Sequence, residues 1–306
     1  MSRPLISGII LIACFSYSTA QMMSFDPRDG IDIAGLDAGY LPDIGGHSVT
    51  NYGANLNFMK PLSTWMIGFG VNYEYLQFDF DESDINTDLS TYEQIHSIRT
   101  NFFIRKPLKN NWSIMISVGP NLMSTLDDGI GSEDIIVNTL GAVSKRWGDF
   151  NKNTTLMIGV LYGSQLGRPT IIPTINLRRK VNEKLSFSIG IPMTGIDYRI
   201  DDKNRLSLSM RPQGVYANNP NPVLVENGEV LENTKLRFNG FNAELSYRRK
   251  LSKNISAVAA GGFVPAPILT IEDSANNELL DLNADAGAFF RIGLRFSVSP
   301  KMGFGN

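Results

Sequence analysis

Residues 65–75 read WMIGFGVNYEY, and every second side chain of this stretch is large and apolar. The apolar set is Trp65, Ile67, Phe69, Val71, Tyr73 and Tyr75, and it alternates with Gly68, Gly70, Asn72 and Glu74. Successive side chains of a β-strand point to opposite faces, so a period of two indicates a strand with one apolar face and one polar face. The stretch therefore predicts a β-strand that separates two different environments.

The same alternation recurs along the chain, and beyond residue 21 no stretch approaches 18 apolar residues in a row. A membrane-spanning helix needs about 20 such residues. The pattern predicts an all-β, antiparallel protein of about fourteen strands, or twelve if one hairpin is absent. The expected strands are 30–40, 49–60, 64–80, 91–106, 111–124, 134–147, 154–164, 170–180, 185–192, 195–200, 204–216, 234–250, 254–265 and 284–298. The two weakest are 30–40, which contains Asp32 and Asp37, and the short 195–200.

Alternation also suits a soluble β-sandwich, but three features favour a transmembrane up-and-down β-barrel. Several expected strands exceed the five or six residues usual in soluble proteins. Short turns alternate with long loops along the whole chain. The short turns 60–63, 106–111, 145–153, 178–184, 200–205 and 248–254 hold 16 Lys or Arg and 4 Asp or Glu. The long loops 81–91, 125–134, 217–233 and 265–285 hold 16 Asp or Glu and no Lys or Arg.

All three tryptophans lie beside short turns. They are Trp65, Trp112 and Trp147. Such a position predicts a ring of aromatic side chains at one membrane interface. In barrels of this kind the short turns face the periplasm and the long loops face the exterior, so the charge pattern also predicts the orientation.

The N-terminus resembles a secretory signal. A basic Arg3 precedes the apolar stretch 5–15, and small residues lead to Ala20. We therefore expect residues 1–20 to be a signal peptide and residues 21–306 to be an outer-membrane β-barrel. A lipoprotein signal ending at Cys14 is the alternative. The net charge of −2 and the sequence pI of about 5.8 argue against nucleic acid as a partner.

Three turns carry a further resemblance. They are Lys60-Pro61-Leu62, Lys106-Pro107-Leu108 and Arg249-Lys250-Leu251, and the expected last strand ends Gly293-Leu294-Arg295-Phe296-Ser297-Val298. With these features the chain resembles an uncharacterised family of single-domain bacterial outer-membrane barrels. The resemblance implies the outer membrane of a Gram-negative-type bacterium, contact with its lipid and lipopolysaccharide, and insertion by the barrel-assembly machinery. The chain departs from the usual assembly signal because it continues to Asn306.

The residues offer little for catalysis, so we expect no enzyme and no cofactor. Histidine-assisted serine chemistry needs a base beside a nucleophile, and the chain has only His47 and His96. We expect His47 to be a solvated turn residue and His96 to face outward near the lipid headgroups. Ser97 follows His96 directly, and adjacent strand residues point to opposite faces.

Acidic clusters raise the question of a metal site. Asp79, Asp81, Glu82 and Asp84 resemble the start of a calcium loop, but the required glycine and final glutamate are not at the needed spacing. Asp127, Asp128, Glu133 and Asp134 are equally dense. We interpret both clusters as solvated loops and assign no metal site, with loose bridging of divalent cations to lipopolysaccharide as the alternative.

Parity along the strands predicts which charged side chains face the lumen. The expected set is Glu74, Arg99, Arg105, Arg178, Arg205, Arg211, Glu244, Arg248, Arg291 and Arg295. Arginine dominates this set, so an open lumen would favour anions. Two functions remain open: a passive channel or transporter for small solutes, and a non-conducting structural or adhesive barrel with acidic surface loops.

The charge-segregated ends predict an accessibility pattern on intact cells. Labels placed near Asp128 and Asn276 should react with an impermeant reagent, because their loops face outward. Labels near Asn110 and Asn254 should react only after the outer membrane is permeabilised. The reverse pattern would overturn the topology.

Overall fold

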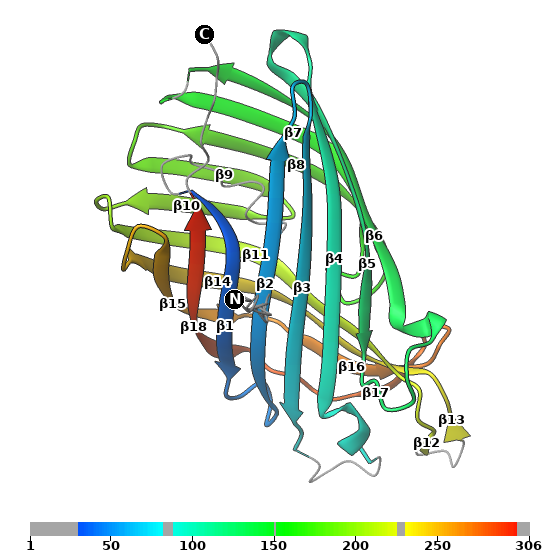
Figure 1. Cartoon of the computed structure of the whole chain (residues 1–306). Helices are drawn as coiled ribbons and strands as arrows, with labels where there is room; N and C mark the ends of the chain where they lie inside the picture. The colour runs from blue at the N-terminus through cyan, green and yellow to red at the C-terminus, as the bar shows by residue number, and fades with distance from the viewer. Residues whose placement is uncertain (1–29, 82–87, 150, 225–229, 299–306) are drawn as a thin grey trace, which may run out of the picture.

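The computed structural model describes residues 30–81, 88–149, 151–224 and 230–298, and these residues form a closed antiparallel barrel (Figure 1). Fourteen strands make the wall: β1 (Ile31–Leu41), β2 (Ser48–Pro61), β3 (Met66–Asp79), β4 (Gln94–Pro107), β5 (Trp112–Ser124), β6 (Ile135–Gly148), β7 (Asn153–Gly163), β8 (Thr170–Lys180), β9 (Leu185–Ile191), β10 (Thr194–Arg199), β11 (Asn204–Asn219), β14 (Thr234–Lys250), β15 (Ile255–Val264) and β18 (Gly287–Val298). The prediction of fourteen strands is confirmed, and the alternative of twelve is wrong. The expected signal peptide lies outside the described residues.

The barrel wall closes on itself. Strands β1 to β11 pair in chain order, β11 pairs with β14, β14 with β15, β15 with β18, and β18 with β1. The helical turns in the described residues are three 3-10 helices, η1 (Ser90–Tyr92), η2 (Lys109–Asn111) and η3 (Ser132–Asp134). Among the same residues, no helix has the length and apolar character needed to cross a membrane.

Four further strands lie in the long loops and were not predicted. They are β12 (Val223–Leu224), β13 (Val230–Leu231), β16 (Ile268–Glu272) and β17 (Glu278–Asp281), all at the same end of the barrel in Figure 1. Strand β16 pairs with β14 beyond the point where β15 ends, so it extends the wall. Leu269 to Glu272 are consecutively buried, so β16 lacks the alternation that identified the other strands.

The barrel is apolar outside and largely polar inside. Large hydrophobic side chains such as Ile116, Ile171 and Ile292 are more than 60% exposed on the outer face. Asparagine and serine side chains on the opposite parity, including Asn55 and Ser97, are fully buried. A water-soluble protein does not expose so much contiguous apolar surface, whereas a barrel in lipid must do so.

The tryptophans lie at the short-turn end of this apolar face. Trp65, Trp112 and Trp147 are all exposed. The ammonium of Lys106 lies 4.6 Å from the ring centroid of Trp65, and that of Lys145 lies 5.3 Å from the ring centroid of Trp112. An aromatic ring beside a lysine is the composition expected at a membrane interface.

A β-bulge near the start of β1 determines which charges enter the lumen. Asp32 and Asp37 are five residues apart, so a regular strand would place them on opposite faces. The register between β1 and β18 shifts between Asp32 and Ala34. Because the bulge inserts one residue, both aspartates lie on the inner face, and both are buried. Asp37 then accepts hydrogen bonds at 2.7 Å from both Arg291 and Arg295 of β18.

Replacing this shared carboxylate should destabilise the barrel. We expect Asp37→Asn to lower the free energy of unfolding by about 3–5 kcal/mol, the usual loss when one member of a buried ion pair is removed. Equilibrium urea unfolding of the refolded protein in lipid vesicles measures the change. Asp149→Asn, at an exposed turn, is the control and should leave the unfolding midpoint unaltered. Equal midpoints for the two variants would contradict the role given to Asp37.

Candidate functional site: the barrel lumen

The charged residues expected in the lumen lie mostly in ion pairs there. Glu74 accepts a hydrogen bond from Arg99 across β3 and β4. Arg248 of β14 donates two hydrogen bonds, of 2.6 and 2.8 Å, to Asp32 of β1. Strands β15 and β18 separate these two strands in the wall. The contact therefore spans these two strands on the inner face of the wall.

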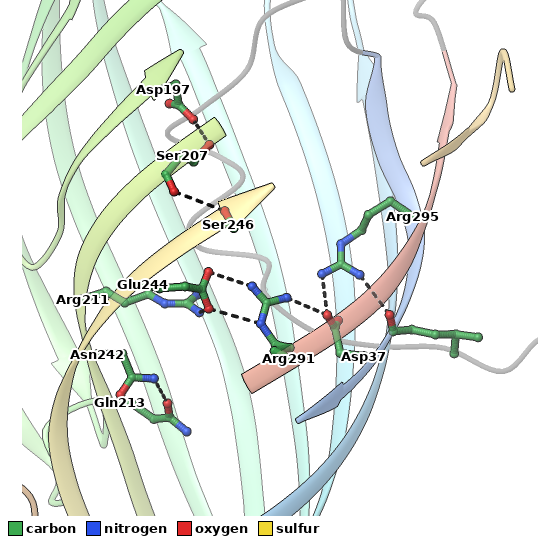
Figure 2. A network of polar contacts seen from close by, with 11 residues as sticks. Asp37, Asp197, Ser207, Arg211, Gln213, Asn242, Glu244, Ser246, Arg291 and Arg295 are labelled. Atoms are coloured by element: carbon green, nitrogen blue, oxygen red, sulfur yellow. Dashed lines mark hydrogen bonds and ion pairs between the residues drawn. The ribbon is translucent and has the colours of Figure 1, made fainter. Parts of the chain in front are cut away.

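A chain of five alternating charges lies on the inner face of the barrel (Figure 2). Its order is Arg211, Glu244, Arg291, Asp37 and Arg295, with N···O distances of 3.5, 2.7, 2.7 and 2.7 Å. The first link is the longest, and the Arg211 side chain is the most exposed member, at 16%. The chain joins β11, β14, β18 and β1, so it connects four strands of the wall.

The other expected arginines lie toward the short-turn end. Arg105 donates a 3.2 Å hydrogen bond to the hydroxyl of Ser113. Arg178 is half-buried and shares its strand face with Asn176. Arg205 is also half-buried and lies opposite Arg248 in the register of β11 and β14. Positive charge thus gathers near the short turns.

Sequence reasoning missed four charged residues on the inner face. They are Asp32, Asp37, Asp197 and Arg199. Asp197 accepts a 2.6 Å hydrogen bond from Ser207, and Figure 2 shows this pair near the five-charge chain. Parity within 195–200 was sufficient to find Asp197 and Arg199, whereas Asp32 required knowledge of the bulge. With these four, the named lumen set holds nine arginines and five carboxylates, so its formal charge remains positive.

At the long-loop end the lumen is filled by apolar side chains, which we call the apolar cap. The apolar cap consists of Ile44, Leu76, Phe78, Leu89, Tyr92, Ile95, Met123, Val215, Ala217, Val223, Leu236, Phe238, Val264, Leu269, Ile271 and Leu282, each almost fully buried. Its members come from opposite walls, since β3 and β4 contribute on one side and β11 and β14 on the other. Side chains from opposite walls in one packed core leave no wide opening at this end.

Ion pairs hold the loops at this end against one another and against β14, next to the apolar cap. The Glu272 carboxylate is completely buried and accepts hydrogen bonds from Arg168, in the loop between β7 and β8, and from Arg237 of β14. Lys235 donates to Glu133 at 3.1 Å and to Asn218 at 2.8 Å. The Arg168–Glu272 and Lys235–Glu133 pairs each join residues about one hundred positions apart in sequence.

His47 is not the solvated turn residue that the sequence suggested. It is 2% exposed, and its Nδ1 accepts a 3.0 Å hydrogen bond from the backbone N–H of Asp81. Its Nε2 lies 2.7 Å from the carbonyl oxygen of Leu282 and must carry the proton that is donated there. The neutral imidazole of His47 thus links three connections at the long-loop end of the barrel, those that contain His47, Asp81 and Leu282. The prediction of a solvated turn is wrong because the burial of His47 depends on loops that are distant in sequence.

Neither histidine forms a nucleophile–base pair with a serine in the described residues. The Nδ1 of His96 lies 2.8 Å from the Tyr73 hydroxyl, and its ring packs against those of Tyr73 and Tyr75 on the outer face. Ser97 points the other way and is fully buried. This geometry offers no base for the Ser97 hydroxyl.

The acidic loop clusters are only partly solvated. Asp134 is buried, accepts a 2.9 Å hydrogen bond from Asn218 and also accepts from the backbone of Gly131. Asp127 accepts from Asn221 at 3.0 Å. Glu82 and Asp84, of the first cluster, lie outside the described residues. Within the part of the chain that the structure describes, no three His, Cys, Asp or Glu side chains gather as metal ligands would.

A cavity of about 50 Å³ lies between the apolar cap and the five-charge chain. Its lining includes three residues of the apolar cap, Leu76, Phe78 and Phe238. It also includes three members of the five-charge chain, Arg211, Glu244 and Arg291, and the amide side chains of Asn51, Gln213 and Asn242. Since a buried water needs roughly 10–15 Å³, the cavity admits a few groups of that size.

Several solved structures are similar to the chain in fold. The COG4313 outer membrane channel from Pseudomonas putida F1 is 10% identical, with a TM-score of 0.44 over 90% of this chain and 100% of that one. The Pseudomonas putida toluene transporter TodX is 10% identical, with a TM-score of 0.37 over 94% and 95%. The outer membrane phospholipase A from Escherichia coli is 10% identical, with a TM-score of 0.38 over 92% and 97%. The likeness extends to the barrel architecture alone.

No curated protein matches the chain. One family model does, and it covers residues 51–303, from β2 to beyond the last described strand. The match spans most of the barrel, so it shows the family. The chain belongs to the family described as a domain of unknown function, DUF6268.

Proposed function

We propose that the protein is an integral outer-membrane barrel that works as a small-solute channel, closed at rest by the apolar cap. The observation that carries this proposal is a single lumen with two unlike halves. Its inner half is polar and rich in arginine, whereas its outer half is apolar and held shut by contacts between loops. A solute path with a removable closure fits this division better than a uniformly packed interior does.

The exposed apolar wall and the tryptophans at one end support placement in the outer membrane. In that setting the partners are bilayer lipid and lipopolysaccharide, with insertion by the barrel-assembly machinery after removal of residues 1–20. Catalysis is not part of the proposal, because His47 is committed to two backbone groups and His96 faces the lipid.

A second candidate is a non-conducting structural or adhesive barrel. The specific observation in its favour is the chain of ion pairs that links β11, β14, β18 and β1 on the inner face of the barrel. Such a chain ties the wall together whether or not anything passes. Electrical recording distinguishes the two candidates.

Wild-type protein in a planar bilayer should conduct poorly, and variants that loosen the apolar cap should conduct more. His47→Ala leaves two buried backbone groups without partners, at a cost of about 1–3 kcal/mol to the closed state. That cost corresponds to a rise of about 5- to 150-fold in the open-to-closed ratio. Ile271→Asn should act likewise through the core itself.

His96→Ala is the matched control, because its side chain lies on the outer face, and it should conduct as the wild type does. Each variant must first show a heat-modifiable band and β-type circular dichroism. Folded barrels that all remain silent would contradict the channel and favour the structural candidate.

The opened channel should prefer anions. Reversal potentials across a salt gradient in the His47→Ala background should report anion selectivity, and Arg105→Met in that background should reduce it. The reason is that guanidinium groups in a narrow passage concentrate anions, and their field is screened at high salt. Cation preference, or no effect of losing Arg105, would defeat this assignment.

A further inference from the structure

The three tryptophans of the chain share a row with basic side chains on the outer face of the barrel. The row begins beside β3 and ends on β8, and each of its members lies close to a short turn. With about 4.8 Å between neighbouring strands, it covers about 24 Å of the wall. We call it the basic row, and it consists of Trp65, Lys106, Trp112, Lys145, Trp147 and Arg179.

Cations and indole rings are neighbours in the first part of the basic row. The Lys106 ammonium lies 4.6 Å from the ring centroid of Trp65. Trp112 is paired with Lys145 across β5 and β6, with 5.3 Å between ammonium and ring centroid. The Lys145 ammonium also donates a 2.6 Å hydrogen bond to the carbonyl oxygen of Asn110. This bond and the ring hold the ammonium at the edge of the apolar wall.

The far end of the basic row has the same composition. Thr154 of β7 is paired with Trp147 of β6 on one side and with Arg179 of β8 on the other. The side chains of Trp147 and Arg179 are exposed. A guanidinium group and an indole ring thus flank a single threonine at the surface.

The basic row carries positive charge that nearby carboxylates do not offset. Strands β2 to β8 contain two carboxylates, Glu74 in the lumen and Asp79 at the long-loop end. Asp149 lies in the turn after Trp147, but Lys152 belongs to the same turn. Among the described residues, no carboxylate forms an ion pair with the three cations of the row.

The basic row is confined to one side of the barrel. The other seven strands of the wall present one outward cation at the short-turn end within the described strand residues, Arg249 of β14. Their remaining outward side chains at this level include Tyr198, Leu206 and Phe296, and none is a tryptophan. The strands β3 to β8 therefore offer a surface chemistry that the rest of the circumference lacks.

A phosphate group at a membrane interface matches this chemistry. Indole N–H, ammonium and guanidinium groups all donate hydrogen bonds, and basic side chains beside a membrane attract anionic lipids. The hydrocarbon chains of such a lipid would lie on the apolar wall next to the row, where Ile114 is paired with Lys106 and is exposed. An acidic protein surface has no such chains to match the apolar wall.

We propose that the basic row binds anionic phospholipids, with the phosphate at the cations and the acyl chains on the adjoining wall. The lipid comes from the membrane leaflet at the short-turn end. Lipopolysaccharide would instead meet the long loops, which are acidic. The inference goes beyond the proposed function, because it requires the barrel to be in a membrane but does not require current.

Tryptophan fluorescence reports directly on the site, because the chain has three tryptophans and all belong to the basic row. The refolded full-length barrel would be placed in phosphatidylcholine vesicles that contain a minor fraction of a brominated quencher lipid. Brominated phosphatidylglycerol should quench with an apparent affinity at least about fivefold above that of brominated phosphatidylcholine, the gain that about one cation near the surface supplies. About 1 M sodium chloride should abolish this preference, because the Debye length falls to about 3 Å.

Two variants test the residues. Lys106→Gln combined with Lys145→Gln should lower the preference for phosphatidylglycerol at least about fivefold. Arg249→Gln removes an exposed cation from the opposite side of the barrel and is the matched control, so it should retain the preference. Each preference is a ratio of two quenchers measured on the same variant, so any change in tryptophan brightness cancels.

A cross-link in cells identifies the source of the lipid. A benzophenone side chain introduced at Ile114, beside Lys106, would be activated by light in cells that carry the barrel in their outer membrane. Mass spectrometry of the purified protein should find a phospholipid adduct. Lipopolysaccharide as the main adduct would reject the phospholipid leaflet as the source and overturn the proposal.

Equal quenching by the two lipids in the wild type, or an unaltered preference in the folded double variant, would overturn the site. Loss of the preference in Arg249→Gln to the same extent would also overturn it, because general charge would then explain the effect. If the double variant does not refold, the salt series on the wild type still decides, since a preference that persists at high salt contradicts recognition by exposed cations.

Discussion

The whole structure depends on the requirement that a sheet in hydrocarbon have no unpaired edge. Each unpaired backbone N–H or C=O costs several kcal/mol in lipid, so β1 must find β18 and complete the ring. Closure then gives every strand one set of side chains that faces outward and one set that faces inward. One set meets lipid, and the other meets a confined interior in which every charge needs a partner.

The ion pairs in the interior depend on the closure of the wall. Arg248 of β14 reaches Asp32 of β1, and Arg291 of β18 contacts Glu244 of β14 and Asp37 of β1. The contacts of Arg248 with Asp32 and of Arg291 with Glu244 join strands that are not neighbours, so they depend on the curvature of the wall. The bulge in β1 belongs to the same arrangement, because without it Asp32 would face lipid and Arg248 would lose its carboxylate.

The strand number and topology could be predicted from the sequence because lipid and lumen select opposite side chains at alternate positions, as 65–75 shows. Parity also selected five arginines that the structure places in ion pairs, namely Arg99, Arg211, Arg248, Arg291 and Arg295, but not Arg168 or Arg237. It failed at Asp32, where a single inserted residue reverses the parity. It could not find β16 or the buried His47, because their surroundings come from loops whose folding depends on contacts distant in sequence.

The two halves of the lumen are physically coupled. Phe289 packs against the apolar cap, and Arg291, two residues farther along the same face of β18, belongs to the charged chain. By excluding water, the apolar cap lowers the local dielectric and strengthens the ion pairs beneath it. Water entering through a loosened cap would solvate Arg211, Glu244 and Arg291 and weaken their attraction. On the proposed function, opening of the long-loop end and loosening of the charged chain would therefore be two aspects of one change, in which each step lowers the cost of the other.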